Sequence, residues 1–293
     1  MRSLVVALLL VLAGCGSLAS PTPDPETATV TPAPVPGGTP PPSAETLAPG
    51  LDEGGVFDAG RLAAAHVDAL AGRSFTLVRT DSRYVDGSLV QRDRSVLRYA
   101  AGGERFRYDL QQTDRREGAN QTARIERYAD GEQVYVAVTS GNRTRYELLR
   151  ASDGSAYAPT RVFPANATNE RGLARLFVLI DTEVVGERTV DGRTVYRLRT
   201  VGSQSVPPLR NITFVANVSE TGLVRSYRLE YDVVRSGQSV HVVASTTYRA
   251  LDETTVKEPP WLARAEEAVR QGTDTSTLTG RATDGGLSAA LGA

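Results

Sequence analysis

Apolar and polar residues alternate with a period of two along much of the chain after Gly72, and this alternation constrains the fold more than any other feature. Successive side chains of a strand point to opposite faces, so such segments predict strands with one dry face and one wet face. The runs 105–110 and 196–199 show the pattern. The clearest case is 223–233, in which apolar and charged residues fall on opposite parities: Tyr227, Leu229, Tyr231 and Val233 against Arg228, Glu230 and Asp232.

Short turn signals separate these runs: Asp86-Gly87, Gly102-Gly103, Asp130-Gly131, Gly141-Asn142, Asp191-Gly192, Thr221-Gly222 and Ser236-Gly237. Closely spaced turns predict that consecutive strands are neighbours in an antiparallel meander. A sheet of about ten strands with one apolar face and few covering helices must curl to hide that face. We therefore predict an α+β fold that is mainly antiparallel β, with a strongly curved meander sheet, or half-barrel, wrapping a few helices.

Three segments have the apolar spacing of amphipathic helices. Asp58 is placed to cap the first, which runs over 61–70 and stops at Gly72. The second carries an apolar stripe over 173–180 and follows Thr168 and Asn169, either of which is a candidate cap. The third follows Pro259-Pro260, carries Trp261, Leu262, Ala265 and Val269, and ends at Gly272.

His66 lies on the same predicted helix face as Leu62 and Leu70, because the three are four residues apart. A ligand or a general base is one interpretation of this histidine. We favour the other, a histidine packed at the edge of a helix that faces the sheet.

The chain divides into four predicted regions. Residues 1–15 form a short basic and apolar export signal, too short for a permanent membrane-spanning helix. Residues 16–50 are rich in Pro, Thr and Ser and predict a disordered tether. Residues 51–272 form the folded sheet-and-helix domain, and 273–293 form a disordered tail.

Cys15 is the only cysteine, and it follows two small residues at the end of the apolar run. This arrangement is similar to the lipobox of exported lipoproteins, in which the cysteine becomes the acylated N-terminus. Two acyl chains suffice for stable residence in a membrane. We expect Cys15 to be the lipidation site and the mature chain to be anchored on the extracellular face of the cell membrane.

The lipobox and tether, the sequence AAAHVDALAGRSFT (Ala63–Thr76) followed by strands, and the hairpin VVGERTVDGRTVYRLR (Val184–Arg199) resemble uncharacterised lipoproteins of haloarchaea. More remotely, the order of elements over about residues 50–270 is similar to the lipoprotein-carrier proteins and the mycobacterial lipid-binding lipoproteins. The resemblance implies a curved antiparallel sheet wrapped with helices around an apolar cavity. It supplies no catalytic residues.

Five N-x-S/T sequons make an exported glycoprotein a further expectation, with candidate sites Asn120, Asn142, Asn166, Asn211 and Asn217. Asn211 and Asn217 share one parity of a predicted strand whose other parity is apolar. Both are therefore predicted to face solvent.

Several function classes find no support. The net charge of −1 gives no global field for nucleic acid. One cysteine and two distant histidines supply neither a metal motif nor a nucleophile with its base, and no glycine-rich phosphate loop is present. We therefore expect no catalytic residues, no metal, no cofactor and no enzymatic activity.

Two functions remain open. The first is binding or carrying a lipid or other apolar ligand in a cavity lined by Tyr108, Phe177, Tyr227, Leu229 and Tyr231, although core packing explains each of these residues equally well. The second is a non-catalytic structural or interaction protein of the cell envelope, with its protein partner unspecified. Charged side chains crowding the inner surface of the sheet would argue against the carrier.

Overall fold

The computed structural model describes residues 45–115, 121–151, 153–162 and 167–272. Most of these residues belong to a single 12-stranded sheet in which every pairing is antiparallel. Its first six strands in the sequence are β4 (Phe75–Val85), β5 (Ser88–Tyr99), β6 (Arg105–Asp114), β7 (Gln121–Asp130), β8 (Val134–Ser140) and β9 (Arg143–Leu148). The other six are β10 (Thr182–Val190), β11 (Arg193–Thr200), β12 (Gln204–Val206), β13 (Leu209–Ser219), β14 (Val224–Arg235) and β15 (Gln238–Arg249).

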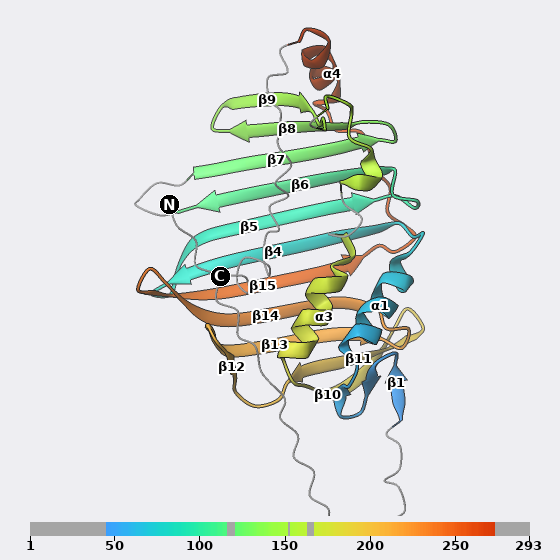
Figure 1. Ribbon diagram of the computed structural model, residues 1–293, viewed down its shortest axis with the longest axis vertical. Coiled ribbons are helices and arrows are strands. Elements are labelled where there is room, and N and C mark those ends of the chain that lie inside the picture. Colours follow the sequence, from blue (N-terminus) through green and yellow to red (C-terminus); the bar gives the residue numbers. More distant parts are fainter. Residues whose placement is uncertain (1–44, 116–120, 152, 163–166, 273–293) are drawn as a thin grey trace, which may run out of the picture. The chain divides into compact units, whose positions relative to one another are not determined.

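The sheet consists of two meanders, not one. Strands β4 to β9 are neighbours in sequence order, and so are most of β10 to β15, with the short β12 lying off this path and pairing with β13. The two halves join because the last strand, β15, pairs with the first long strand, β4. Consecutive strands β9 and β10 therefore lie at opposite edges of the sheet (Figure 1). The connection between them carries the short 3-10 helix η2 (Pro159–Arg161) and the helix α3 (Glu170–Leu179).

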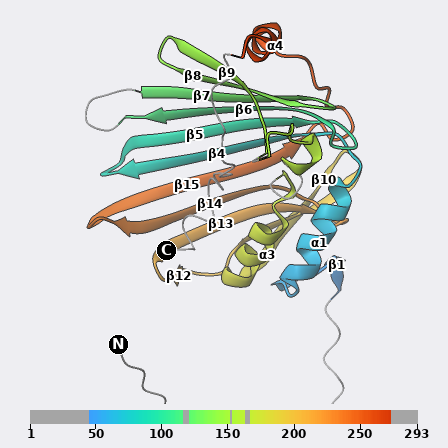
Figure 2. The ribbon, with the colours of Figure 1, turned by 45° about the horizontal axis from the view of Figure 1, so that its top comes forward.

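The predicted fold class is confirmed: the sheet is antiparallel and curved, its edges β9 and β10 do not pair, and it is accompanied by a few helices. Helices α1 (Ala59–Leu70) and α3 lie on one face of the β10–β15 half (Figures 1 and 2). We call this face, marked by the buried Phe214 and Leu229, the helix-facing face, and its opposite the outer face. No helix within the described ranges is both long and apolar enough to cross a membrane.

Helix α1 begins and packs as its sequence predicts. The side chain of Asp58 accepts a hydrogen bond from the backbone N–H of Arg61 at 2.9 Å, which satisfies one of the free amides of the first turn. Leu62 and Ala63 are buried in the main apolar cluster beneath the helix.

Helix α3 departs from prediction at its start. Asn169 occupies the N-cap position, but its backbone is left-handed (φ 54°) and its side chain makes no capping bond. Its amide instead donates to the hydroxyl of Tyr227 at 3.3 Å. The apolar stripe is confirmed, because Leu173, Leu176 and Phe177 are buried against the sheet.

Helix α4 (Leu262–Arg270) lies on the outer face, whereas we expected the sheet to wrap its helices on one side. Trp261 and Ala265 pack with Tyr128 and Tyr135, which pair in register on β7 and β8. Their neighbours on those strands, such as Ala129, point to the opposite face and join a different cluster. Tyr128 and Tyr135 therefore point to the outer face, where Trp261 and α4 bury them.

A second, three-stranded sheet consists of β1 (Thr46–Ala48), β2 (Leu51–Asp52) and β3 (Gly55–Val56). Ala48 is buried in the main apolar cluster. Ordered structure thus begins within the range 16–50 that we predicted to be tether, because Ala48 and the residues after it have apolar partners. The predicted signal, the remainder of the tether and the tail at 273–293 lie outside the described residues.

Candidate ligand-binding surface

Four of the five predicted cavity residues lie in one packed cluster. Phe177, Tyr227, Leu229 and Tyr231 are each at most 6% exposed and belong to the apolar cluster under α1 and α3. The rings of Phe177 and Phe214 meet edge to face, with centroids 5.6 Å apart, and the ring of Tyr227 lies 6.0 Å from that of Phe214. These side chains fill the space between helices and sheet with one another.

Tyr108 differs from the other four, because it lies on β6 in the β4–β9 half and is partly exposed. Cross-strand partners lie on the same face of a sheet. The strand register therefore shows which residues of the other strands lie on the helix-facing face. Tyr227 pairs with Thr246, which pairs with Arg79 on β4. Two strands further along, Leu110 lies in the same row and on the same face as Arg79.

The helix-facing face of the β4–β9 half carries a partly exposed apolar row. Leu110 pairs with Ile125, and Ile125 pairs with Val138, so three aliphatic side chains stand side by side on β6, β7 and β8. All three have intermediate exposure, unlike the buried residues beneath α1 and α3. This row is apolar surface that the described helices leave partly open to solvent.

Arg127 flanks this row. It pairs with Tyr108 and Val136, and its guanidinium carbon lies 5.8 Å from the centre of the Tyr108 ring, within range of a cation–π interaction. Burial lowers the pKa of Arg127, and the negative charge of an ionised Tyr108 would oppose that shift. A partly desolvated cation thus stands directly beside aliphatic side chains.

Carboxylates occupy the row on the other side. Asp81 pairs with Asp93 across β4 and β5, and the Asp81 carboxylate lies 3.4 Å from the Arg83 guanidinium. Burial raises the pKa of Asp81, while the Arg83 charge opposes that shift. Burial, and then the charge of Asp81, also raise the pKa of Tyr231.

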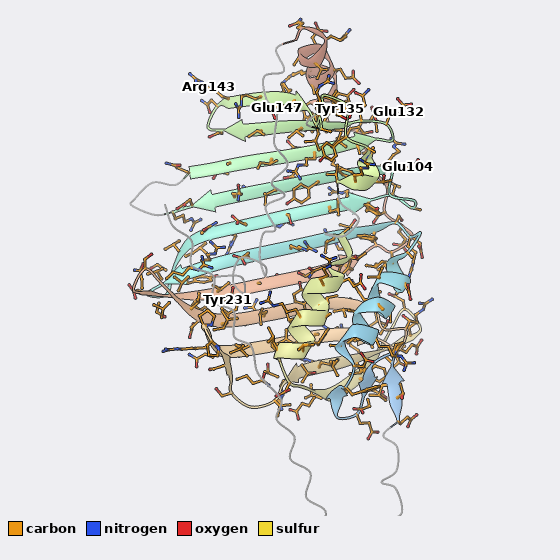
Figure 3. All side chains as sticks on the ribbon, viewed as in Figure 1. Glu104, Glu132, Tyr135, Arg143, Glu147 and Tyr231 are labelled. Carbon is orange, nitrogen blue, oxygen red and sulfur yellow. The ribbon has the colours of Figure 1, made fainter. Side chains whose placement is uncertain are left out.

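Polar groups lie toward both ends of this face. The neutral phenol of Tyr231 lies on β14, and the carboxyl group of Glu147, which is 3% exposed and pairs with Val136, lies on the edge strand β9 (Figure 3). The prediction of a uniformly dry inner face is therefore wrong for the β4–β9 half, which is amphipathic. Arg127 carried a signal for this in the sequence, because it shares the parity of Ile125 and Ala129 in an otherwise apolar series. The segment 79–83 contained a second signal, because its charged residues Arg79, Asp81 and Arg83 share the parity of the apolar Leu77.

His66 is a packed core residue, as we favoured. It is fully buried, its Nδ1 accepts the backbone N–H of Val224 at 3.2 Å, and its ring meets that of Tyr248 edge to face at 4.9 Å. Burial lowers its pKa to about 4, and the backbone of Thr168 opposes the shift.

This pKa predicts a loss of stability in mild acid. The unfolded chain protonates His66 near pH 6.5, whereas the folded chain does so only near pH 4. The contribution of neutral His66 to the free energy of unfolding is therefore fully present above pH 6.5. It falls by up to about 3 kcal/mol as the pH decreases from 6.5 to 4. Urea unfolding of the wild type and of His66→Gln at pH 7 and pH 4.5 should show a smaller pH effect in the variant. An identical pH effect in both chains would contradict the assignment.

The described sequons differ in environment. Asn142 is exposed in the turn between β8 and β9. Asn211 is exposed, and its amide donates to the Asp232 carboxylate at 2.7 Å. Asn217 is only partly exposed, and its amide donates to the Ser226 hydroxyl at 2.9 Å. Use of these sites stays a prediction, and Cys15, Asn120 and Asn166 lie outside the described residues.

Solved structures with likeness to this chain include LprF from Mycobacterium bovis, at 10% identity over 69% of this chain and 96% of that chain, with a TM-score of 0.35. A LolA superfamily protein from Nitrosomonas europaea is 12% identical over 69% of this chain and 95% of that chain, with a TM-score of 0.23. No curated protein sequence matches the chain. The model of a family of unknown function, DUF7537, matches residues 1–265, and the chain therefore belongs to that family.

Proposed function

We propose that this protein is a non-catalytic lipoprotein, anchored through Cys15 at the extracellular face of the cell membrane, that binds an amphipathic lipid-like molecule. The ligand lies on the helix-facing face of the β4–β9 half. One observation carries the proposal: the partly exposed row Leu110, Ile125 and Val138 stands beside the partly desolvated Arg127.

The chemistry of this surface selects an amphiphile over a wholly apolar molecule. Aliphatic side chains gain about 25 cal/mol for each Å² of apolar surface that a bound hydrocarbon removes from water. A carboxylate or phosphate head group would interact favourably with Arg127, whereas a wholly apolar ligand would desolvate that guanidinium further without compensation. The charge of Arg127, which argues against a wholly apolar ligand, therefore fits a ligand with an anionic head.

Ligand binding is tested by displacement of a fluorescent fatty acid from the full-length protein in detergent-free solution, with Cys15→Ser preventing acylation. We expect oleate to bind. Ile125→Asp should lower the affinity for oleate at least tenfold, because it places a carboxylate at the centre of the apolar row. Thr139→Asp adds the same charge at the outer parity of β8 and should leave the affinity unchanged.

The variant Arg127→Gln distinguishes the contribution of the head group to binding from that of the hydrocarbon chain. It should lower the affinity for oleate but not for oleyl alcohol, which has the same chain and no charge. Failure of oleate to bind, or equal weakening by Ile125→Asp and Thr139→Asp, would refute the proposal.

The packed cluster of Phe177, Tyr227, Leu229 and Tyr231 favours a second candidate, a structural or interaction protein of the cell envelope. A body filled with its own side chains needs no ligand to be stable. Lipid extraction of the purified protein followed by mass spectrometry distinguishes the two, because the second candidate predicts no stoichiometric lipid.

A further inference from the structure

A pocket of about 220 Å³ opens on the outer face of β5 and β6, away from the surface proposed above. It is lined by three arginines, two neutral polar residues and one leucine: Arg92, Arg94, Arg115, Gln111, Thr113 and Leu89.

The strand register explains why these side chains converge. Arg94 pairs with Gln111 and Arg92 pairs with Thr113, so two cross-strand pairs stand next to each other on one face. Asp93, between the two arginines in sequence, points to the helix-facing face. The alternation therefore sends both guanidinium groups outward and the intervening carboxylate to the other side.

Arg115 completes the pocket just beyond the end of β6. Its backbone N–H donates to the carbonyl of Val90 at 2.8 Å, which continues the antiparallel pairing by one residue and keeps Arg115 beside β5. Arg92 and Arg94 thus lie within the long strand β5, and Arg115 directly follows its partner strand β6. A β-sheet is a more rigid support for a binding site than a free loop.

The charge of this pocket is unbalanced among the described residues. No carboxylate lines it. Neighbouring arginines on the same outer face are neutralised, because Arg124 pairs with Asp109, and Arg107 lies 3.3 Å from the carboxylate of Glu126.

Within the part of the chain that the structure describes, the side chain of Arg92 makes one hydrogen bond, through its Nε. This Nε donates to the hydroxyl of Ser82 on the neighbouring strand β4, at 3.3 Å. The side chain of Arg92 is exposed and lines the pocket, so its other N–H groups are available as donors. The arrangement concentrates positive charge locally in a chain whose net charge is −1.

We propose that this pocket binds a phosphate- or sulfate-type oxyanion, either as a free anion or as the head group of an anionic lipid. The planar guanidinium fork matches two oxygens of such a group, and charge-assisted bonds of this kind are about twice as strong as neutral ones. The Thr113 hydroxyl and the Gln111 amide supply further donors for the remaining oxygens. Leu89 gives one wall that suits the ester carbon of a substituted phosphate.

The test uses the full-length chain carrying Cys15→Ser, so that an acyl anchor does not contribute to membrane binding. Calorimetric titration with sodium phosphate measures the free anion, and co-sedimentation with phosphatidylglycerol vesicles, against phosphatidylcholine vesicles, measures the head group. Arg94→Gln and Arg92→Gln remove one pocket charge each. Arg124→Gln removes the same charge from the same face, but from an arginine already neutralised by Asp109.

We expect each pocket variant to weaken binding at least tenfold and Arg124→Gln to weaken it less than twofold. Phosphate binding with this pattern identifies a free-anion site, and binding confined to phosphatidylglycerol vesicles with the same pattern identifies a head-group site. Absence of binding to both probes, or equal weakening by all three variants, overturns the proposal. These arginines are exposed, so unchanged thermal unfolding of each variant shows that a loss of binding is not a loss of fold.

Discussion

Replacing Phe214 by alanine should lower the free energy of unfolding by about 4 kcal/mol, within the usual range of 3–5 kcal/mol for a fully buried phenylalanine. Phe214 is 0% exposed and stands between Phe177 on α3 and Tyr227 on β14. Its removal leaves a cavity where helix and sheet meet, and the strand backbone on one side limits its collapse. Urea unfolding monitored by circular dichroism measures the loss as a lower midpoint at an unchanged slope.

The control is Val234→Ala on β14, where the side chain is 56% exposed and its loss should cost less than about 0.5 kcal/mol. The comparison also addresses ligand binding. If this cluster lined a ligand cavity, Phe214→Ala would enlarge it and lose little stability. A loss below about 1 kcal/mol would therefore contradict the packed core and reopen the cavity predicted from Phe177, Tyr227, Leu229 and Tyr231.

Local elements were predictable because their signals are local. The α1 helix follows from one capping carboxylate, Asp58, and from the spacing of Leu62, His66 and Leu70. The hairpins follow from turn residues such as Asp86-Gly87, where both residues adopt positive φ angles. Each of these features involves residues a few positions apart, so a short stretch of sequence contains the information needed.

The arrangement of the two meanders was not predictable in this way. It depends on the pairing of β15 with β4, for example Tyr248 with Leu77, across most of the folded chain. Either strand pairs well with any apolar neighbour of matching pattern, so alternation alone does not choose the partner. The face covered by α4 was equally hidden, since Trp261 finds its partners only once Tyr128 and Tyr135 are side by side.

The candidate ligand-binding surface was predictable only in part. The sequence shows which residues alternate, and so it singled out Tyr108, Leu229 and Tyr231 as inward-facing. It does not show which inward-facing residues a helix covers. The structure divides them: α1 and α3 bury the β10–β15 half, and the partly open surface lies around Ile125 and Arg127.

The N-terminal boundary of the fold gives the other large expected effect. Gly55 on β3 has a φ of +121°, which side-chain-bearing residues rarely adopt, and a Cβ there would lie 1.8 Å from the carbonyl oxygen of Thr182 on β10. Thr182 is 6% exposed, so the contact lies in a closed environment. Gly55→Ala should cost about 4 kcal/mol, because backbone strain and overpacking each contribute about 1–3 kcal/mol.

Gly54→Ala is the matched control, because Gly54 has no positive φ and its added Cβ would meet only the flexible side chain of Asp52 at 3.2 Å. It should change the free energy of unfolding by less than about 1 kcal/mol. If residues 45–56 were an extension of the tether, the two variants would unfold alike, since neither glycine would contact the main sheet. A difference of several kcal/mol between adjacent glycines therefore means that β3 docks on β10, and that the three-stranded sheet is part of the folded body.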